Sequence, residues 1–509
     1  MGYRVKAVDL LGLVMPRTAA KYLMGRYQFQ QAQRLYEGVS SSQYRPTIAN
    51  RTSGDGVMNI AGGRLREYSR ELEENHDLVV SVFDDLVNNA IGEGARVQPM
   101  VRMADGKLAE DFNDSLGELW TKWGQDPETT GELAFPSVER LVARCMFRDG
   151  EIFVQKVIDG RYPHRTDLRL ALELIEADFC PFDYQDISRN VLHGVENNAW
   201  NRATAFWLWK NHPGDPLNLS IMPRAEDLKR VPASDMLHIK FSRRLRQRRG
   251  VPIIHAVLNR MRDVKDYEES ERIAAKVAAD MTGFIKRTAE YNGPTEVNAS
   301  GNREFSLQAG AIFQLQPGED VATIASNRPN AGLEKFRNAM LRAVAGGTGT
   351  RYSSISRDYN GTYSAQRQEL VEGAIAYRAH FAYLVSRFHR PVYEQFIAQA
   401  MLSKQLGRIP RGLDMTTLNR VDFRAPALPW IDPSSEAKAY ATLVEANLES
   451  RAEIMRQRGR DPVKVIEEIE EERASGLSAV MIQKAAASAT PGQASEDAQP
   501  GETDSAAAA

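Results

Sequence analysis

The chain has 509 residues, which is long enough for two to four domains with hydrophobic cores of their own. Its 65 lysines and arginines nearly balance its 67 aspartates and glutamates, and the formal net charge is −2. This balance excludes a global basic field that would draw the protein onto nucleic acid or an anionic membrane. Any contact with DNA must therefore be local or weak.

The first 63 residues predict an N-terminal arm and an exposed linker. A short apolar patch, Val8 to Met15, contains Asp9 and lacks a small-residue cleavage site, so we expect no signal peptide. Residues 36 to 63 are rich in Ser, Gly and Asn, which is typical of an exposed connection. No run of 18 apolar residues occurs in the sequence, so we expect neither a membrane span nor a membrane partner.

Residues 64 to 250 predict an α+β region. Apolar residues recur at helical spacing from Arg64 to about Asn89, and a turn at Gly92 and Gly94 follows. Two further helices and then several strands after an Asp149-Gly150 turn are predicted. The helices are Lys107 to Trp123 and Pro136 to Arg148, and the strands are Ile152 to Val157, Leu168 to Ile175, Val191 to Val195, Ala203 to Trp209 and one around Leu237.

Five arginines fall within seven residues after the strand around Leu237. They are Arg243, Arg244, Arg246, Arg248 and Arg249. Such a run indicates candidate contacts with phosphate groups. Because the rest of the chain is charge-balanced, two alternatives stay open, namely a solvated loop and a loop neutralised by acidic side chains of a neighbouring subunit.

A small β module is predicted between two helices. The first helix follows Pro252 and occupies residues 251–282, and the second occupies residues 331–345. Between them, residues 283–330 alternate short β-like runs with Gly, Pro and Asn turns.

A glycine- and hydroxyl-rich loop at residues 346–362 leads into an unusually long helical pattern, residues 363–402. A helix from Tyr363 to Met401 would span roughly 60 Å unless Pro391 bends it. Two shorter core helices joined near Pro391 are the alternative.

Residues 403–483 begin with a proline-rich passage and predict two further helices. Each starts at an Asp-Pro pair, Asp432-Pro433 and Asp461-Pro462, which supplies an N-cap carboxylate and a proline at the first helical position. Residues 484–509 hold too few apolar side chains to offset ordering, so we expect a disordered tail.

The common catalytic devices are missing from the sequence. It lacks GxxxxGK[ST], HExxH, GxSxG and paired CxxC motifs. Cys145 and Cys180 are far apart among apolar neighbours, which predicts neither a disulfide framework nor a zinc site and favours a reducing compartment. His238, His380 and His389 lie on a predicted strand or helix, where structural roles are favoured. We therefore expect no catalytic residues, cofactor or metal site; carboxylates converging on a divalent ion, as in a nuclease, are the alternative.

Several separated motifs resemble the lambda-type family of tailed-bacteriophage portal proteins. In chain order they are RRGVP (Arg248 to Pro252), AADMTGFI (Ala278 to Ile285), LQPGED (Leu315 to Asp320), SRDYNGTYSAQR (Ser356 to Arg367), PWIDP (Pro429 to Pro433) and GRDP (Gly459 to Pro462). The resemblance covers roughly Leu65 to Arg473. One departure concerns the usual Tyr-Ser-Ser-x-Arg, which here reads Tyr363-Ser364-Ala365-Gln366-Arg367, so any role of the second serine hydroxyl is in doubt.

The resemblance implies a dodecameric ring at one capsid vertex, through which DNA is packaged and later ejected. Residues 64–250 and 363–402 would form the wing, 251–282 and 331–345 the stem helices, 283–330 the clip, and 403–483 crown-like helices. Residues 346–362 would be the tunnel loop at the narrowest part of the channel. Its expected DNA-facing residues are Arg351, Tyr352, Ser353, Ser354, Arg357, Asp358, Tyr359 and Asn360. A plain flexible connection is the alternative for this loop.

The implied partners are double-stranded DNA bound transiently and without sequence preference, and further copies of the chain. Others are the large terminase subunit, capsid and scaffolding proteins, and head-completion or tail-connector proteins. The implied location is the virion, after assembly in the host cytoplasm. A net charge near zero suits a conduit, because each neutralised phosphate would add salt-dependent affinity that holds DNA still. The rival interpretations are a nucleic-acid enzyme such as a nuclease subunit, and a capsid protein without a channel.

Overall fold

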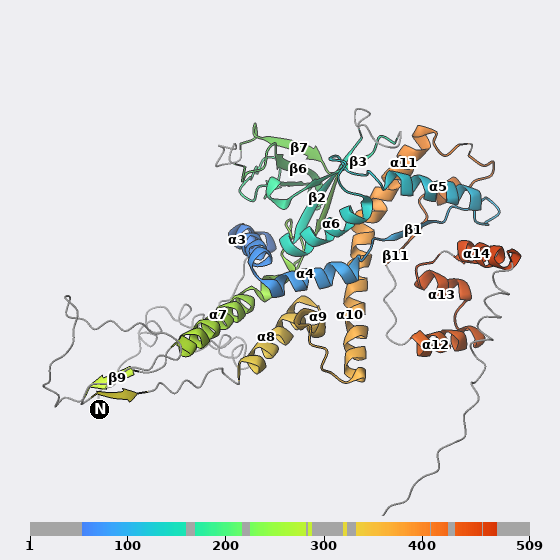
Figure 1. Cartoon of the computed structure of the whole chain (residues 1–509). Helices are drawn as coiled ribbons and strands as arrows, with labels where there is room; N and C mark the ends of the chain where they lie inside the picture. Colours follow the sequence, from blue (N-terminus) through green and yellow to red (C-terminus); the bar gives the residue numbers. More distant parts are fainter. Residues whose placement is uncertain are drawn as a thin grey trace, which may run out of the picture. The chain divides into compact units, whose positions relative to one another are not determined.

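The computed structural model describes residues 53–158, 168–215, 224–280, 284–287, 319–322, 332–407, 409–425, 433–460 and 462–475. The chain divides into two units, Met1–Val57 and Met58–Ala509. The second unit holds the sheets (Figure 1). The residues of the hydrophobic core also belong to this unit. Its mixture of helices and antiparallel sheets confirms the predicted α+β class. Most of the predicted N-terminal arm and the whole predicted C-terminal tail lie outside the described residues.

The first predicted helix is in fact two helices, α3 (Gly54–Asn75) and α4 (Asp77–Ala90). Between them His76 adopts an extended conformation, with φ −131° and ψ 109°. Its imidazole is buried, and Nε2 lies 3.0 Å from the carbonyl oxygen of Met261 on a later helix. The break therefore gives a buried polar side chain its partner. Because α3 starts at Gly54, the predicted linker to residue 63 is too long.

Helices α5 (Glu110–Trp123) and α6 (Phe135–Asp149) carry an aromatic part of the core. The ring centroids of Trp120 and Phe135 are 5.0 Å apart, and Trp120 lies equally close to Phe396. Both contacts are edge-to-face, which suits the ring quadrupoles. Aromatic packing thus joins α5 and α6 to the later helix that carries Phe396.

Two antiparallel sheets follow α6. One has the strand order β3-β2-β8, with β2 (Glu151–Val157) between β3 (Ala171–Ile175) and β8 (Met236–Lys240). The other runs β4-β5-β6-β7, through Val191–Leu192, Val195–Asn197, Ala203–Trp209 and Leu228–Pro232. A separate pair joins β1 (Arg96–Pro99) to β11 (Val421–Arg424) and was not predicted.

The predicted pair of helices around a β module is present. After a 3₁₀ turn at Ile253–Ala256, α7 spans Leu258–Asp280 and α8 spans Leu333–Thr348. They contact each other through the rings of Tyr267 and Phe336, whose centroids are 4.8 Å apart. Between them in the chain, β9 (Phe284–Arg287) pairs antiparallel with β10 (Glu319–Ala322). The other predicted β run, AIFQLQ at residues 311–316, lies outside the described residues.

The long helical pattern is one helical run with a wide turn inside it. Helix α10 (Tyr363–Leu384) passes through a π turn at Val385–His389 into α11 (Arg390–Ser403). The Arg390 N–H donates to the carbonyl of Val385, five residues back. Pro391 has no N–H and its ring would crowd the preceding α turn, so widening that turn relieves the conflict. The single-helix interpretation is therefore confirmed, and the alternative of two separate core helices is wrong.

Three helices, rather than the predicted two, end the described part of the chain. They are α12 (Pro433–Glu445), α13 (Arg451–Gln457) and α14 (Pro462–Ala474). The predicted starts at Pro433 and Pro462 are correct, while Asp432 and Asp461 lie outside the described residues. The extra helix has an N-cap at Ser450, whose hydroxyl accepts a 3.0 Å hydrogen bond from the Glu453 N–H.

Candidate nucleic-acid interface

Arg249 is a buried structural residue. Its side chain is fully buried, and Nε donates to Glu151 Oε1 at 2.7 Å. The rest of the guanidinium donates to three carbonyl oxygens, those of Cys180 (2.7 Å), His193 (3.0 Å) and Ala177 (3.0 Å). Nη2 also lies 2.7 Å from Glu151 Oε1. All five N–H donors of the guanidinium are therefore engaged, and none is left for an outside ligand.

Glu151 is the acceptor at the centre of this region. Besides the bond from Arg249, its carboxylate accepts hydrogen bonds from Arg66 Nη2 (2.7 Å), His238 Nε2 (2.9 Å) and the Gly250 N–H (2.8 Å). Burial alone would raise the pKa of this carboxyl, but Arg249, His238 and Arg66 outweigh burial and hold the pKa well below its usual range. Burial also lowers the pKa of His238 to about 4. The imidazole is therefore neutral at pH 7 and donates to the carboxylate.

Arg248 is buried as well. Its hydrogen bonds connect the arginine-rich segment to the four-stranded sheet. Its guanidinium donates to the Asn190 carbonyl (3.0 Å), to Asn190 Oδ1 (3.0 Å) and to the Val195 carbonyl (3.1 Å). The prediction that Arg248 and Arg249 contact phosphate is therefore wrong, because both are buried and bonded within their own chain. Of the five arginines, Arg243, Arg244 and Arg246 are exposed.

The predicted tunnel loop begins with an ordered turn and a short helix. Gly349 ends α8 in the left-handed conformation, with φ 74°, and the hydroxyls of Thr348 and Thr350 lie 2.7 Å apart. Helix α9 (Tyr352–Ser356) follows, and Ile355 on it is buried in the main core. The glycine- and hydroxyl-rich segment is thus anchored, which the alternative of a plain flexible connection did not anticipate.

Arg351 attaches this segment to α4 and α10. Its Nη2 lies 3.2 Å from Asp85 Oδ1 and donates to Asn89 Oδ1 at 3.1 Å, and Tyr377 OH donates to the other Asp85 oxygen. Burial alone would lower the pKa of Arg351, but Tyr377 and Asp85 more than offset it, and the net shift is upward. Arg351 is therefore a partly buried anchor with an acidic partner in its own chain.

The exposed tip of the segment is residues 357–362. Arg357 has a positive φ of 56° and is exposed, as are Tyr359, with 58% of its surface accessible, and Asn360. Asp358 Oδ1 accepts from the Asn360 N–H at 3.1 Å, which closes the turn. Thr362 then caps α10. Of the predicted DNA-facing residues, Arg357, Tyr359 and Asn360 are presented outward, whereas Tyr352, Ser353, Ser354 and Asp358 are partly buried.

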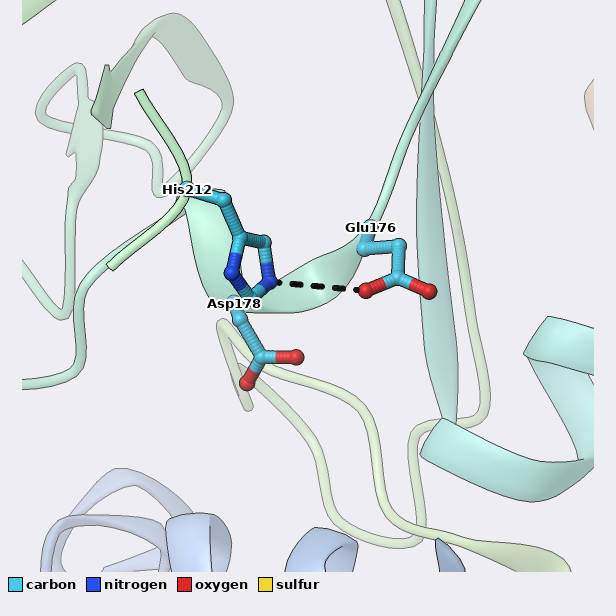
Figure 2. Close-up of side chains that lie close together, drawn as sticks. All are labelled: Glu176, Asp178 and His212. Atoms are coloured by element: carbon cyan, nitrogen blue, oxygen red, sulfur yellow. Dashed lines mark ion pairs between the residues drawn. The ribbon is translucent and has the colours of Figure 1, made fainter. Parts of the chain in front are cut away.

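One cluster in the described part of the chain has the composition of a metal site. Figure 2 shows Glu176, Asp178 and His212 converging, with His212 Nε2 3.5 Å from Glu176 Oε2. The carboxylates already have cationic neighbours, because Arg66 and Arg70 lie 3.0 and 2.5 Å from the Asp178 oxygens. Arginine charges at these distances disfavour a divalent cation. The cluster is best described as part of an ion-pair network.

The two cysteines are buried free thiols. Burial raises the pKa of Cys145 to about 12 and that of Cys180 to about 11. Neither side chain is therefore a thiolate at neutral pH, and neither is suited to be a nucleophile.

Comparison with known proteins identifies the family. The model of the family described as phage portal protein, lambda family, matches residues 41–380. The chain belongs to this family. Among curated portal proteins, it is 28% identical to a probable portal protein of Halomonas phage phiHAP-1, over 83% of this chain and 82% of that one. It is 23% identical to portal protein B of Escherichia phage lambda, over 72% and 75%.

The chain is also similar to a solved structure. A chain from the neck of a native gene transfer agent particle matches with a TM-score of 0.48 and 11% identity, over 80% of this chain and 94% of that one. The family match includes the arginine-rich segment and the segment around α9, whereas the PWIDP and GRDP motifs lie after it. None of the helices in the described part combines the length and apolar character that a membrane span requires.

The anchoring residues of this portal protein, Asp85 and Glu151, were not predicted. The sequence nevertheless indicates both residues. Asp85 lies among apolar residues of a helix, next to Leu86, and Glu151 is the first residue of an apolar strand. A carboxylate among apolar neighbours needs a buried cationic or hydrogen-bonding partner. The partners themselves, Arg351 and Arg249, are 266 and 98 residues away in the chain.

Proposed function

We propose that copies of this chain form a closed ring, a dodecamer, at one capsid vertex of the virion, and that the ring is the conduit for DNA packaging and ejection. The observation that supports a ring best is the exposure of apolar side chains on α7, α8 and α10. They are Ile273, Phe336, Val371 and Ile375. A neighbouring copy in a cyclic assembly would bury them, with free energy roughly proportional to the apolar area covered.

Within that ring we assign the parts by their place in the chain. Residues 64–250 and the long helix form the wing, α7 and α8 the stem, the β9–β10 pair belongs to the clip, and α12 to α14 are crown-like. The clip would receive the large terminase subunit and later the head-completion or tail-connector proteins, and the outer parts would meet capsid and scaffolding proteins. The portal works as a conduit and docking ring without catalysis.

The tip at residues 357–362 is the part of the tunnel loop that would touch DNA. It offers one guanidinium, one phenol ring and one amide, on Arg357, Tyr359 and Asn360. Such a sparse set suits transient contact with the phosphate backbone, because few phosphates are neutralised by each copy. Arg243, Arg244 and Arg246 are the members of the arginine-rich segment that lie at the surface, where a negatively charged partner can reach them.

The first test is the mass and shape of the purified protein. We expect light scattering to give the mass of a dodecamer, and negative-stain images to show rings with a central hole. A stable monomer at the concentrations used for assembly would contradict the proposal. A nuclease subunit would instead show DNA cleavage that depends on a divalent cation, and a shell protein would show no central hole.

The second test concerns the tunnel-loop tip. A deletion of the whole segment would remove Arg351 and the buried Ile355, so the sharper variant is Arg357→Ala with Tyr359→Ala. We expect intact rings and less DNase-protected DNA in a packaging reaction with the motor of the same phage. Ser364→Ala, an exposed change on α10 outside the tip, is the control. Packaging by the double variant equal to that by the control would remove the tip from the mechanism.

A further inference from the structure

Three loops, those before β4, between β5 and β6 and after β8, carry the most exposed large apolar side chains in the described part of the chain. Ile187 is 96% exposed, Leu245 is 95% exposed and Trp200 is 91% exposed. Single exposed apolar residues are ordinary, but a group of them marks an interaction site.

Hydrogen bonds hold these three loops beside one another. Arg248, three residues after Leu245, donates to the carbonyl and side chain of Asn190, three residues after Ile187. Asn190 Nδ2 in turn donates to the Asn197 carbonyl at 2.9 Å, three residues before Trp200. Each apolar tip is therefore a few residues from a bond that joins its loop to the next one.

The loops are also held by hydrogen bonds within their own turns. In the Ile187 loop, Asp186 Oδ1 accepts from the Ser188 N–H at 2.9 Å. Asn198 Oδ1 accepts from the N–H groups of Trp200 (3.0 Å) and Arg202 (2.9 Å). Gln247 Oε1 accepts from the N–H groups of Arg243 and Arg244, each at 3.2 Å. Preformed turns lose little conformational freedom when a partner binds, so the apolar tips are presented for binding.

Exposed arginines surround the tips, and together they make what we call the arginine–apolar surface. Its members are Ile187, Trp200 and Leu245 with Arg189, Arg202, Arg243, Arg244 and Arg246. Asp186 lies 3.7 Å from Arg189 and offsets one of these charges. Phosphate contact would need the arginines alone, whereas aromatic and aliphatic anchors among arginines are typical of protein–protein contacts. The composition therefore favours an acidic protein surface as the occupant.

Helix α14 of this chain has the complementary composition (red in Figure 1). Three exposed apolar side chains, Val463, Ile466 and Ile469, recur at a spacing of three. Five exposed glutamates accompany them, Glu467, Glu468, Glu470, Glu471 and Glu472. A cyclic ring needs two different, complementary surfaces on each copy, because its contacts are head-to-tail.

We propose that α14 of one copy binds the arginine–apolar surface of the neighbouring copy. The apolar face of the helix covers Ile187, Trp200 and Leu245, and its glutamates pair with the surrounding arginines. This inference rests on the proposed ring and names one pair of surfaces that closes it.

Cysteine cross-linking tests the contact directly in the assembled full-length protein. The variant carries Trp200→Cys and Ile466→Cys, and a short bismaleimide joins cysteines that lie close together. We expect a ladder of covalent multimers on a denaturing gel, and none from Ser386→Cys with Ile466→Cys, a control with an exposed cysteine on the long helix. Rings that yield no ladder, or only a link within one chain, would overturn the inference while the ring itself stands.

Charge exchange gives an independent test. Replacing Arg243, Arg244 and Arg246 by Glu should raise the concentration at half-assembly roughly tenfold or more, and adding Glu467→Lys, Glu468→Lys and Glu471→Lys should restore it. Arg411→Glu with Arg420→Glu, at exposed positions elsewhere, is the control and should leave assembly unchanged. If the arginine variant assembles normally but binds DNA less well, the surface contacts nucleic acid and the inference is wrong.

Discussion

The arginine-rich segment and the tunnel loop both place arginines at the surface and inside the protein, but they are anchored at different depths. In the first, Arg249 is fully buried and shares Glu151 with Arg66 and His238. In the second, Arg351 is partly exposed and shares Asp85 with Tyr377. Arg249 and Arg351 are already bound by carboxylates or carbonyls of their own chain, so neither is placed to contact another molecule.

The burial of the anchoring arginine should also determine how easily each segment opens. Because Arg248 and Arg249 are buried, their end of the arginine-rich segment should open only when the surrounding sheets unfold. The predicted tunnel loop is held by the partly buried Arg351 and the buried Ile355, so it should open locally at lower cost.

Of the variants that test this difference, Arg249→Ala should lower the free energy of unfolding most. Removing the guanidinium leaves Glu151 and several carbonyl oxygens without their main donor, and we expect a loss of about 3 to 5 kcal/mol in the free energy of unfolding. Denaturant unfolding followed by circular dichroism measures it. Arg243→Ala, a truncation of the same residue type at an exposed site, should change stability by about 0.5 kcal/mol or less. Equal losses in the two variants would contradict the buried-anchor interpretation.

The second largest effect is expected from acid, which should reduce the stability that Glu151 and His238 contribute. Between pH 6.5 and about 4, the unfolded state protonates His238 while the folded state does not, so stability falls as the pH falls. For one proton the slope is at most about 1.4 kcal/mol per pH unit. The depressed pKa of Glu151 acts in the same direction, because its contribution is present above about pH 4.5 and is lost below it.

The His238→Gln variant tests the histidine contribution separately, since it keeps a donor for Glu151 but does not titrate. Its unfolding midpoint should change less between pH 7 and pH 5 than that of the unmodified protein. An identical pH dependence in the two proteins would show that His238 is not the titrating group.

Asp85→Asn should have a moderate effect on the shallower anchor. The change removes the negative charge that Arg351 pairs with, at a cost of about 1 to 3 kcal/mol. It should also accelerate trypsin cleavage after Arg357, because the tunnel loop opens more often. Tyr377→Phe removes a single hydrogen bond to the same carboxylate and should give a smaller acceleration. Cleavage at an unchanged rate would show that Asp85 does not hold the loop.

The smallest effect on stability is expected from the exposed tip. Arg357→Ala with Tyr359→Ala removes side chains that project into solvent, so the unfolding free energy should change by about 0.5 kcal/mol or less. A thermal unfolding scan measures it. A large loss would mean that the tip packs against the fold, and that it is not free to contact DNA.

Local sequence patterns predicted most helices and strands because each depends on nearby residues. Apolar spacing was sufficient to predict α5, α6 and α8. A proline at the first helical position was sufficient to predict where α12 and α14 begin. The break at His76 was missed because the apolar stripe continues from Leu72 to Val79 on either side of it. The α13 helix was also missed, although Ser450 and Glu453 form a recognisable capping pair.

Pairings between distant parts of the chain could not be predicted in this way. The β1–β11 pair joins Arg96 to Arg424, and no local pattern marks either strand as the partner of the other. For the same reason the burial of Arg249 could not be predicted, because it depends on Glu151 and on carbonyl groups of other loops. The family resemblance supplied the order of the parts but not which side chains they bury.

The π turn before Pro391 has a consequence for how the length of this chain can vary. Leu384, Phe388, Val392 and Phe396 follow one another at intervals of four, which in a regular α-helix would rotate each by about 40° relative to the last. The wider turn absorbs part of that rotation, and all four side chains remain in the core. The turn thus accommodates one additional residue without displacing the aromatic cluster on α11, and this makes it the natural place for a single insertion or deletion in the long helix.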